Sequence, residues 1–283
     1  MFRVMVSMSF VGALGFLLAL FFPANMAQAE DASAITTCAT SGRIVPVDAY
    51  ACKHTPDVYK ARIYEQGFCK SDPMSTGTFS AETCDKVFEN PAGFVVDIVA
   101  AMQKSVPLEG TFTSAPSGSY GFPYIWMSHL ITMKNQVTSD GTTYYSDEFG
   151  SATTNEAAFS EYMVDSTSTS TLETQCDGEY LNTAFAAGKV DAYLVNAAGR
   201  ALTAADGVNI ENRWECVGRQ AFIGVITLDE PIVITDETSS LTLEFAVTDN
   251  GGSAREDISG PYANDGVPEG FTTSPFIINF IVE

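Results

Sequence analysis

The chain has 283 residues, of which 46% are hydrophobic and 17% charged, and 35 acids against 14 bases give a net charge of −21. This apolar content is enough for a sizeable buried core and excludes global disorder. The charge argues against nucleic acid and anionic membrane surfaces as partners, because both are bound through Lys and Arg. We therefore expect a folded, acidic protein, and its net charge favours solubility.

The first 29 residues have the parts of a secretory signal peptide. Arg3 precedes an apolar run over 10–22, and Pro23 leads to the small-residue site Ala27-Gln28-Ala29. The alternative is an uncleaved membrane anchor, because residues 4–22 are uncharged and about long enough to span a bilayer. The proline and the cleavage motif favour removal of 1–29. We expect a mature chain, 30–283, that is secreted to the extracellular space, periplasm or cell surface and is free of the membrane.

An even number of cysteines in an exported chain favours disulfides. The six are Cys38, Cys52, Cys69, Cys84, Cys176 and Cys216. Sequence order favours pairing each with its neighbour, as Cys38–Cys52, Cys69–Cys84 and Cys176–Cys216, although fifteen pairings are formally open. No pair has C-x-x-C spacing and the chain has two histidines, so a zinc site has few ligands. We expect no cofactor and no dedicated metal site.

The first part of the mature chain predicts an arm and two strands. Residues 30–56 are the arm, and 58–64 alternate with period two, with Tyr59, Ala61 and Ile63 on the inner face. A polar connection over 70–92 leads to a second strand over 94–99. Asp97 interrupts that apolar strand and is interpreted as a residue of its outward face.

The middle of the chain predicts a long strand, a hairpin and an insertion. The strand covers 125–137, with apolar residues at most odd positions and His129 among them. Asp140-Gly141 predicts a tight turn into 142–145, because glycine supplies the positive φ that such turns need. Residues 146–220 contain an unbroken Ser/Thr tract and are predicted as an excursion from the sheet, with short helices near 156–163 and 198–205.

The last part of the chain returns to strands. These are predicted over 222–228, 232–235 and 241–248, and a glycine-rich loop over 249–270 leads to a last strand over 276–282. The last strand is apolar on both faces, which indicates a central or fully covered position. Strands in runs without βαβ alternation favour an antiparallel sandwich. The predicted fold is all-β: one antiparallel β-sandwich domain over 30–283, with an N-terminal arm (30–56) and a long, partly helical insertion (146–220).

One motif carries a resemblance. The turn Pro116-Ser117-Gly118-Ser119-Tyr120, the early strand at 58–63 and the late L-T-L-E-F strand at 241–245 resemble secreted bacterial β-sandwich domains of the prealbumin-like and immunoglobulin-like kind. The extra cysteines and the 146–220 insertion depart from that pattern. The resemblance implies a sandwich, a fold that hosts many roles.

The sequence gives little sign of catalysis. It has no G-x-S-x-G elbow, phosphate-binding glycine loop or dinucleotide fingerprint. A buried, hydrogen-bonded role is favoured for His129 over a catalytic base, and His54 is interpreted as an exposed turn residue beside a disulfide. Dispersed carboxylate pairs leave a hydrolase as a minor alternative. We expect a protein that is not an enzyme.

Two features indicate ligand binding as an alternative. Tyr120, Phe122, Tyr124 and Trp126 follow at spacing two and, if exposed, would form a stacking platform, although core filling is favoured. Asp249, Asn250 and Asp265 lie in oxygen-rich turns and are weak calcium candidates, which ordinary turn chemistry also explains.

The expected function is that of a secreted, non-enzymatic surface or matrix protein with a structural or adhesive role. In its sharper form it is a self-assembling subunit whose strand over 276–282 pairs with the open sheet edge of a neighbour. The alternative is an extracellular carbohydrate- or calcium-binding module. The expected partners are further copies of the chain or an extracellular glycan or protein, and not nucleic acid.

Overall fold

The computed structural model describes residues 4–9, 38, 51–102, 109–165, 176, 183–185, 188–210, 213–238, 240–249, 251–255, 267–273 and 277–282. Most of the secondary structure in these ranges is β-strand, and the strand pairs are antiparallel, which confirms the all-β prediction. Within the same ranges, no helix combines the length and apolar character that a bilayer crossing requires.

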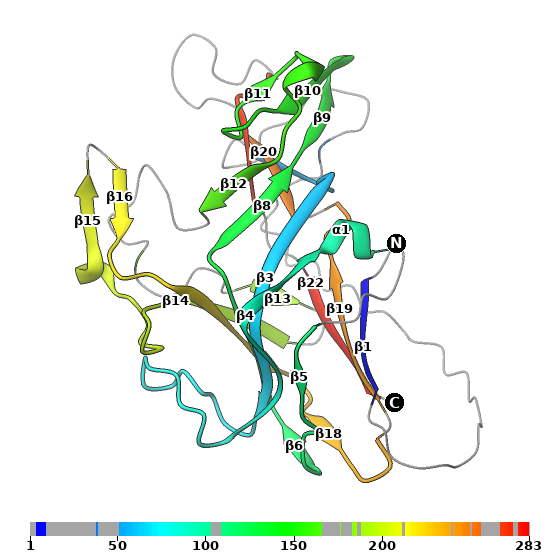
Figure 1. The fold of residues 1–283 in the computed structure, drawn as a ribbon, viewed down its shortest axis with the longest axis vertical. Helices are drawn as coiled ribbons and strands as arrows, with labels where there is room; N and C mark the ends of the chain where they lie inside the picture. The colour runs from blue at the N-terminus through cyan, green and yellow to red at the C-terminus, as the bar shows by residue number, and fades with distance from the viewer. Residues whose placement is uncertain are drawn as a thin grey trace.

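A nine-stranded sheet forms the centre of the molecule (Figure 1). Its main path is β12-β8-β3-β7-β17-β14-β13, and β4 pairs with β3 and with β5. The strands are β3 (Val58–Cys69), β4 (Cys84–Asp97), β5 (Thr111–Phe112), β7 (Phe122–Met127), β8 (Leu130–Lys134), β12 (Tyr162–Asp165), β13 (Thr183–Phe185), β14 (Gly188–Val195) and β17 (Ala221–Leu228). The long strand β3 pairs with β4 on one side and with β7 and β8 in succession on the other.

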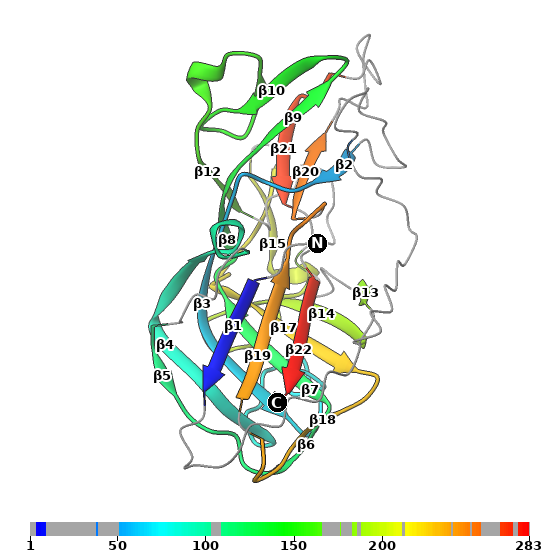
Figure 2. The same ribbon diagram turned by 90° about the vertical axis from the view of Figure 1, so that its right-hand side faces the viewer.

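Smaller sheets surround this centre. Their strands are β1 (Val4–Ser9), β19 (Ser240–Ala246) and β22 (Ile277–Val282); β2 (Ala51–His54), β20 (Gly252–Arg255) and β21 (Gly270–Thr273); β9 (Gln136–Ser139), β10 (Thr142–Ser146) and β11 (Ala152–Thr153); β15 (Gly207–Ile210) and β16 (Arg213–Cys216); and β6 (Gly118–Tyr120) and β18 (Ile232–Ile234). The β1-β19-β22 sheet lies over one face of the lower half of the central sheet, which gives the two layers of a sandwich (Figure 2).

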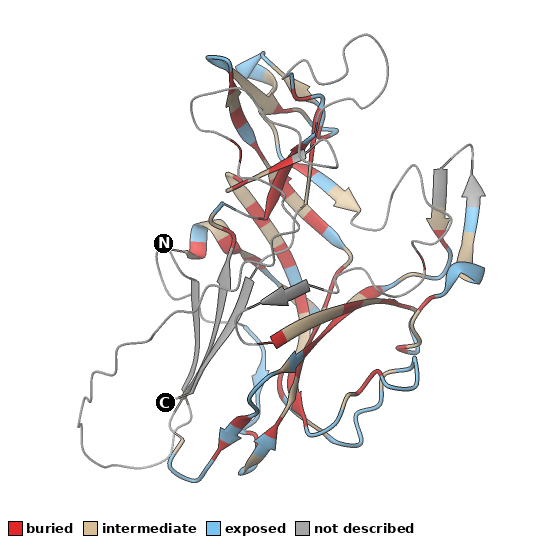
Figure 3. Ribbon diagram, turned by 180° about the vertical axis from the view of Figure 1, so that it is seen from behind, coloured by how far each residue is buried: buried red, intermediate tan, exposed pale blue. Residues whose placement is uncertain are grey.

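Buried side chains on both faces of the central sheet form the core, and they follow the predicted alternation. Tyr59, Ala61 and Ile63 of β3 are each at most 2% exposed, which confirms the inner face that the sequence predicts. Figure 3 shows buried positions alternating with more exposed ones along the central strands. Burial of one face of each strand supplies the main favourable free energy of such a fold.

The predicted hairpin at Asp140-Gly141 is confirmed. Ser139 pairs with Thr142, so the loop has two residues, and both adopt positive φ, 46° at Asp140 and 79° at Gly141. These angles match the right-handed twist of the flanking strands β9 and β10. The strands predicted at 222–228, 232–235 and 241–248 are also present, as β17, β18 and β19.

Two predicted boundaries in the first half are wrong. The polar connection over 70–92 ends early, because β4 begins at Cys84, where Cys84 pairs with Cys69. The strand at 94–99 ends at Asp97, whose side chain accepts a hydrogen bond from the Ala100 amide at 3.2 Å and caps the short helix α1 (Ile98–Ala101). Asp97 lies on the face of β4 opposite the buried Val96, as predicted, and it is also the N-cap of α1.

The single long strand predicted over 125–137 is three strands, β7, β8 and β9. The breaks fall at Ser128-His129 and at Asn135, where polar side chains interrupt the apolar positions. The hydroxyl of Ser128 accepts a hydrogen bond from the Leu130 amide, a local bond that competes with continuation of the ladder.

The prediction that 146–220 leaves the sheet is wrong for β12, β13 and β14, whereas β15 and β16 form a separate sheet of two strands. Strand β12 pairs with β8, and β14 pairs along its whole length with β17. The predicted helices are reduced to the 3-10 turns η1 (Glu156–Ala158) and η2 (Ala204–Asp206) in the described residues. Side chains such as Tyr162, Leu194 and Val195 enter the buried clusters, so tertiary packing overrides the local helical pattern.

Two predictions for the last part of the chain are also corrected. The loop predicted over 249–270 contains β20, which pairs with β2 and β21. The last strand, β22, is predicted to be central or fully covered, and it is not central. Among the described residues it stands at the end of its sheet, and β19 is the central strand.

Candidate functional site

The three disulfides connect Cys38 with Cys52, Cys69 with Cys84 and Cys176 with Cys216, which is the pairing that sequence order favours. All six cysteines are paired, so the chain offers no thiol for nucleophilic or metal chemistry. An oxidising compartment is where such crosslinks form and persist.

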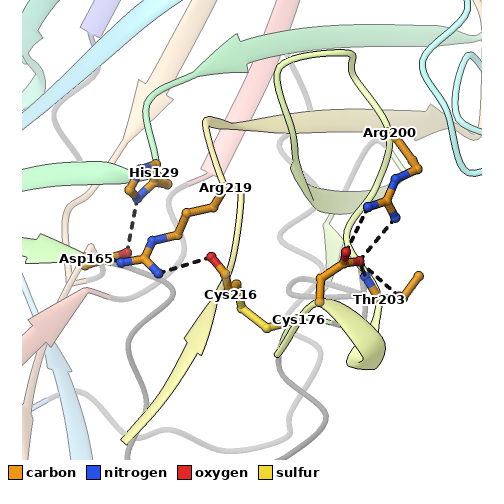
Figure 4. The surroundings of a disulfide bond; sticks show 8 residues. His129, Asp165, Cys176, Arg200, Thr203, Cys216 and Arg219 are labelled. Atoms are coloured by element: carbon orange, nitrogen blue, oxygen red, sulfur yellow. Dashed lines mark hydrogen bonds and ion pairs between the residues drawn. A yellow bond between two sulfur atoms is a disulfide. The ribbon is translucent and has the colours of Figure 1, made fainter. Parts of the chain in front are cut away.

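A charged cluster lies beside the Cys176–Cys216 disulfide (Figure 4). The Nδ1 of His129 lies 3.1 Å from one carboxylate oxygen of Asp165, and the Arg219 guanidinium lies 2.8 Å from the other. Arg219 also donates to the backbone carbonyl of Cys216 at 3.2 Å. The side chains of His129, Asp165 and Arg219 are all largely buried.

Three chain segments meet at this cluster. His129 stands just before β8, Asp165 is the last residue of β12, and Arg219 lies between β16 and β17. A carboxylate that orients a histidine is also part of a hydrolase triad, but here the same carboxylate is bound by an arginine. The cluster therefore joins chain segments by a hydrogen bond and an ion pair beside a covalent crosslink. His129 has the hydrogen-bonded role that the sequence favours, although between two strands rather than within one.

A second ion pair fixes the turn after β14. Arg200 contacts Asp206 through two guanidinium nitrogens, at 2.9 and 3.1 Å, and Asp206 also accepts from the backbone amide and the hydroxyl of Thr203 (Figure 4). The hydrogen bond from Arg200 is the main reason that the pKa of Asp206 falls to about 2. The two-pronged geometry is typical of structural arginine–carboxylate pairs.

His54 belongs to a buried polar network, so its interpretation as an exposed turn residue is wrong. It is 7% exposed, and its Nε2 lies 2.8 Å from Oδ1 of Asn135. The side-chain amide of Asn135 donates to the Tyr162 hydroxyl at 2.8 Å, and the backbone amide of Asn135 donates to the Ser146 hydroxyl. The network thus joins β2, β10 and β12 at the break between β8 and β9.

Burial governs the protonation of this network. Desolvation lowers the pKa of His54 to about 4, so the ring is neutral at pH 7. Burial also raises the pKa of the Tyr162 hydroxyl, which keeps it protonated. The sequence does hold a signal for His54: it stands two residues after Cys52, and period two places both on the buried side of β2.

Of the aromatic set, Tyr120 and Tyr124 are buried and Phe122 and Trp126 are partly buried, which agrees with the core filling that the sequence favours over a stacking platform. Tyr120 and Tyr124 are 0% and 3% exposed, and they belong to different buried clusters. Phe79 packs against both Tyr124 and Trp126, so the residues at spacing two fill the core instead of presenting a face to a ligand. The turn at Gly121 between β6 and β7 separates Tyr120 from the other three residues of the set, which include Phe122.

The calcium candidates are only partly described. The backbone amide of Asp249 donates to the Thr55 hydroxyl at 2.7 Å, and its φ of 53° is that of a turn. Asn250 and Asp265 lie outside the described residues. Across the described part of the chain, no three His, Cys, Asp or Glu residues are grouped in a way that would hold a metal ion.

The backbone edge of the β1-β19-β22 sheet is the remaining candidate for a functional surface. β22 pairs with β19 through six residues, from Ile277 opposite Ala246 to Val282 opposite Leu241. In the part of the chain that the structure describes, β22 ends this sheet. The end strand of a sheet carries amide and carbonyl groups that can accept a further strand. Comparisons with protein-family models, curated proteins and solved structures found no match to this chain.

Proposed function

We propose that this chain is a secreted, non-enzymatic protein with a structural or adhesive role at the cell surface or in an extracellular matrix, and that it self-assembles by strand addition. The observation that carries the proposal is the position of β22 at the end of a sheet. Its sequence, Ile277-Ile278-Asn279-Phe280-Ile281-Val282, has no charge and high β propensity. Short segments of this composition favour pairing between chains.

Export supports the same proposal. The signal-peptide pattern of residues 1–29 directs the chain out of the cytoplasm, and three disulfides suit the oxidising space beyond it. Disulfides restrict the unfolded chain and so help a subunit to persist outside the cell.

The mature chain, 30–283, tests the proposal when it is produced in an oxidising compartment. Light scattering after gel filtration should show a mass that rises with protein concentration, and electron microscopy should show elongated assemblies. The Ile281→Pro variant removes a backbone donor from β22 and should abolish assembly. Val233→Pro, in the partly exposed strand β18, is the matched control that should leave assembly intact.

Circular dichroism and free-thiol titration would check that both variants fold and keep three disulfides. A mature chain that stays monomeric at every concentration, with isolated particles in the microscope, would refute self-assembly. Retained assembly in a folded Ile281→Pro protein would refute the role of β22.

A further inference from the structure

We infer that residues 4–9 of the leader cap the β19 edge, and that their removal opens this edge to strand β22 of a second copy. The inference rests on the proposed function and names the surface and the partner through which assembly proceeds. Its basis is the pairing of β1 with β19, which joins six residues from Val4 opposite Phe245 to Ser9 opposite Ser240. β19 therefore has a strand on each side only while the leader is attached.

The two partners of β19 occupy equivalent registers. Phe245 is opposite Val4 on one side and Ile278 on the other. Leu243 is opposite Val6 and Phe280, and Leu241 is opposite Met8 and Val282. At each of these three positions on β19, β1 and β22 both supply an apolar residue.

This equivalence points to β22 of another copy as the replacement for β1. β22 has the same six-residue length, the same antiparallel sense and apolar residues at the same three registers. If it adds to the vacated side of β19 in a neighbour, β19 and β22 alternate from copy to copy in one continuous sheet. Such a contact joins two different surfaces, so it repeats from copy to copy and extends the sheet.

The leader then acts as a built-in inhibitor of assembly. A capped β19 edge cannot accept a neighbour, because its backbone groups are already paired with β1. Removal of residues 1–29 at the signal-peptide site exposes those groups outside the cytoplasm. Assembly is in this way restricted to the compartment where the disulfides form.

A synthetic peptide of residues 3–10 tests the inference on the mature chain, 30–283. Added in excess, it should occupy the β19 edge of each copy and lower the assembled fraction at least about tenfold, because every capped edge stops growth. The same peptide with Val6→Pro is the matched control. It keeps the apolar composition but loses a backbone donor, and it should leave assembly unchanged.

Amide hydrogen exchange supplies the second measurement. Residues 240–246 should exchange faster in the mature monomer than in the assembled protein or in the peptide-bound monomer. The inference is overturned if the mature protein assembles but the peptide has no effect, or if the proline peptide inhibits equally well. Full protection of 240–246 in the mature monomer would also overturn it, because another segment of the same copy would then cover the edge. A mature chain that never assembles refutes the proposed function itself.

Discussion

The hydrogen bonds and the charge of the buried His54 ring depend on the groups around it. Its Nε2 is paired with Asn135, whereas its Nδ1 is buried and has no hydrogen-bond partner among the described atoms. The ring also lies edge-on to Phe271, with ring centroids 5.9 Å apart. A proton added to this ring would place a charge in the core without a counter-ion among these contacts, and such charges are costly.

Acidification should therefore weaken the fold through His54. The unfolded chain takes up the proton at the ordinary pKa of 6.5, and the folded chain only at about 4. Between these values the unfolded state binds more protons, so the free energy of unfolding falls as the pH falls. The contribution of His54 should be complete above pH 6.5 and should shrink by about 3 kcal/mol by pH 4.

Urea unfolding of the wild type and of His54→Gln from pH 7.5 to pH 4 would measure this contribution. The free energy of unfolding of the wild type, minus that of His54→Gln, should fall as the pH falls, because only the wild type loses stability through His54. His129→Gln is the matched control, since it removes the other histidine of the chain and leaves the His54 contribution in place. If the free energies of unfolding of the wild type and of His54→Gln differ by the same amount at every pH in this range, protonation of His54 is not the cause of the loss of stability.

At the scale of the element, β14 shows how part of the 146–220 segment joins the central sheet. It pairs with β17 over eight residues, from Gly188 opposite Leu228 to Val195 opposite Ala221. Gly188 begins the strand with a φ of 149°, and a Cβ there would lie 2.1 Å from the carbonyl oxygen of Thr227. The approach of β17 therefore requires the absence of a side chain at this position.

Substitution of this glycine should be strongly destabilising. Gly188→Ala should lower the free energy of unfolding by at least about 3 kcal/mol, because backbone atoms must separate to admit the methyl group. Gly121→Ala is the control: its Cβ would meet no atom within 4 Å, and its effect should stay within about 0.5 kcal/mol. Chemical unfolding of the two variants, with disulfides intact, would measure both effects. Equal stability of the two variants would show that β14 and β17 do not approach this closely.

The sequence predicts elements well where one physical signal dominates. Period-two alternation predicts β3 and its inner face, and the Asp-Gly pair predicts the β9–β10 hairpin. It fails where the outcome depends on distant partners. β12 and β14 lie in the sheet because β8 and β17 pair with them, and neither pairing can be read from local residue patterns.

In the candidate site, too, local signals predict some features, whereas others depend on residues far apart in the sequence. Sequence order alone favours the three disulfide pairings that the structure contains, because each joins cysteines adjacent in the sequence order. The Asp165–Arg219 contact joins residues 54 positions apart and gives no local signal. The position of β22 at a sheet end, among the described residues, also depends on which strands flank β19, and its apolar sequence predicts a central or fully covered position.

At the scale of the whole molecule, charge opposes the proposed assembly. The net charge is −21, and residues 1–29 contain one base, Arg3, and no acid, so the chain that the proposal expects after their removal is one unit more negative. Copies that approach each other repel before any backbone hydrogen bond can form. β22 itself carries no charge, so the repulsion comes from charges elsewhere in the chain. It acts over the electrostatic screening length, which shortens as the ionic strength rises.

Added salt should therefore accelerate assembly of the mature chain. The screening length shortens from about 30 Å at 0.01 M to about 8 Å at 0.15 M ionic strength, and the assembly rate should rise by about an order of magnitude over this range. Time-resolved light scattering in NaCl would measure the rate, with Ile281→Pro as the variant that should not respond.

Calcium chloride at matched ionic strength separates screening from specific binding. Comparable rates in the two salts fit general screening, whereas a much larger rise with calcium would mean that bound cations link the copies, and the acidic surface would then be a binding site and not only a barrier.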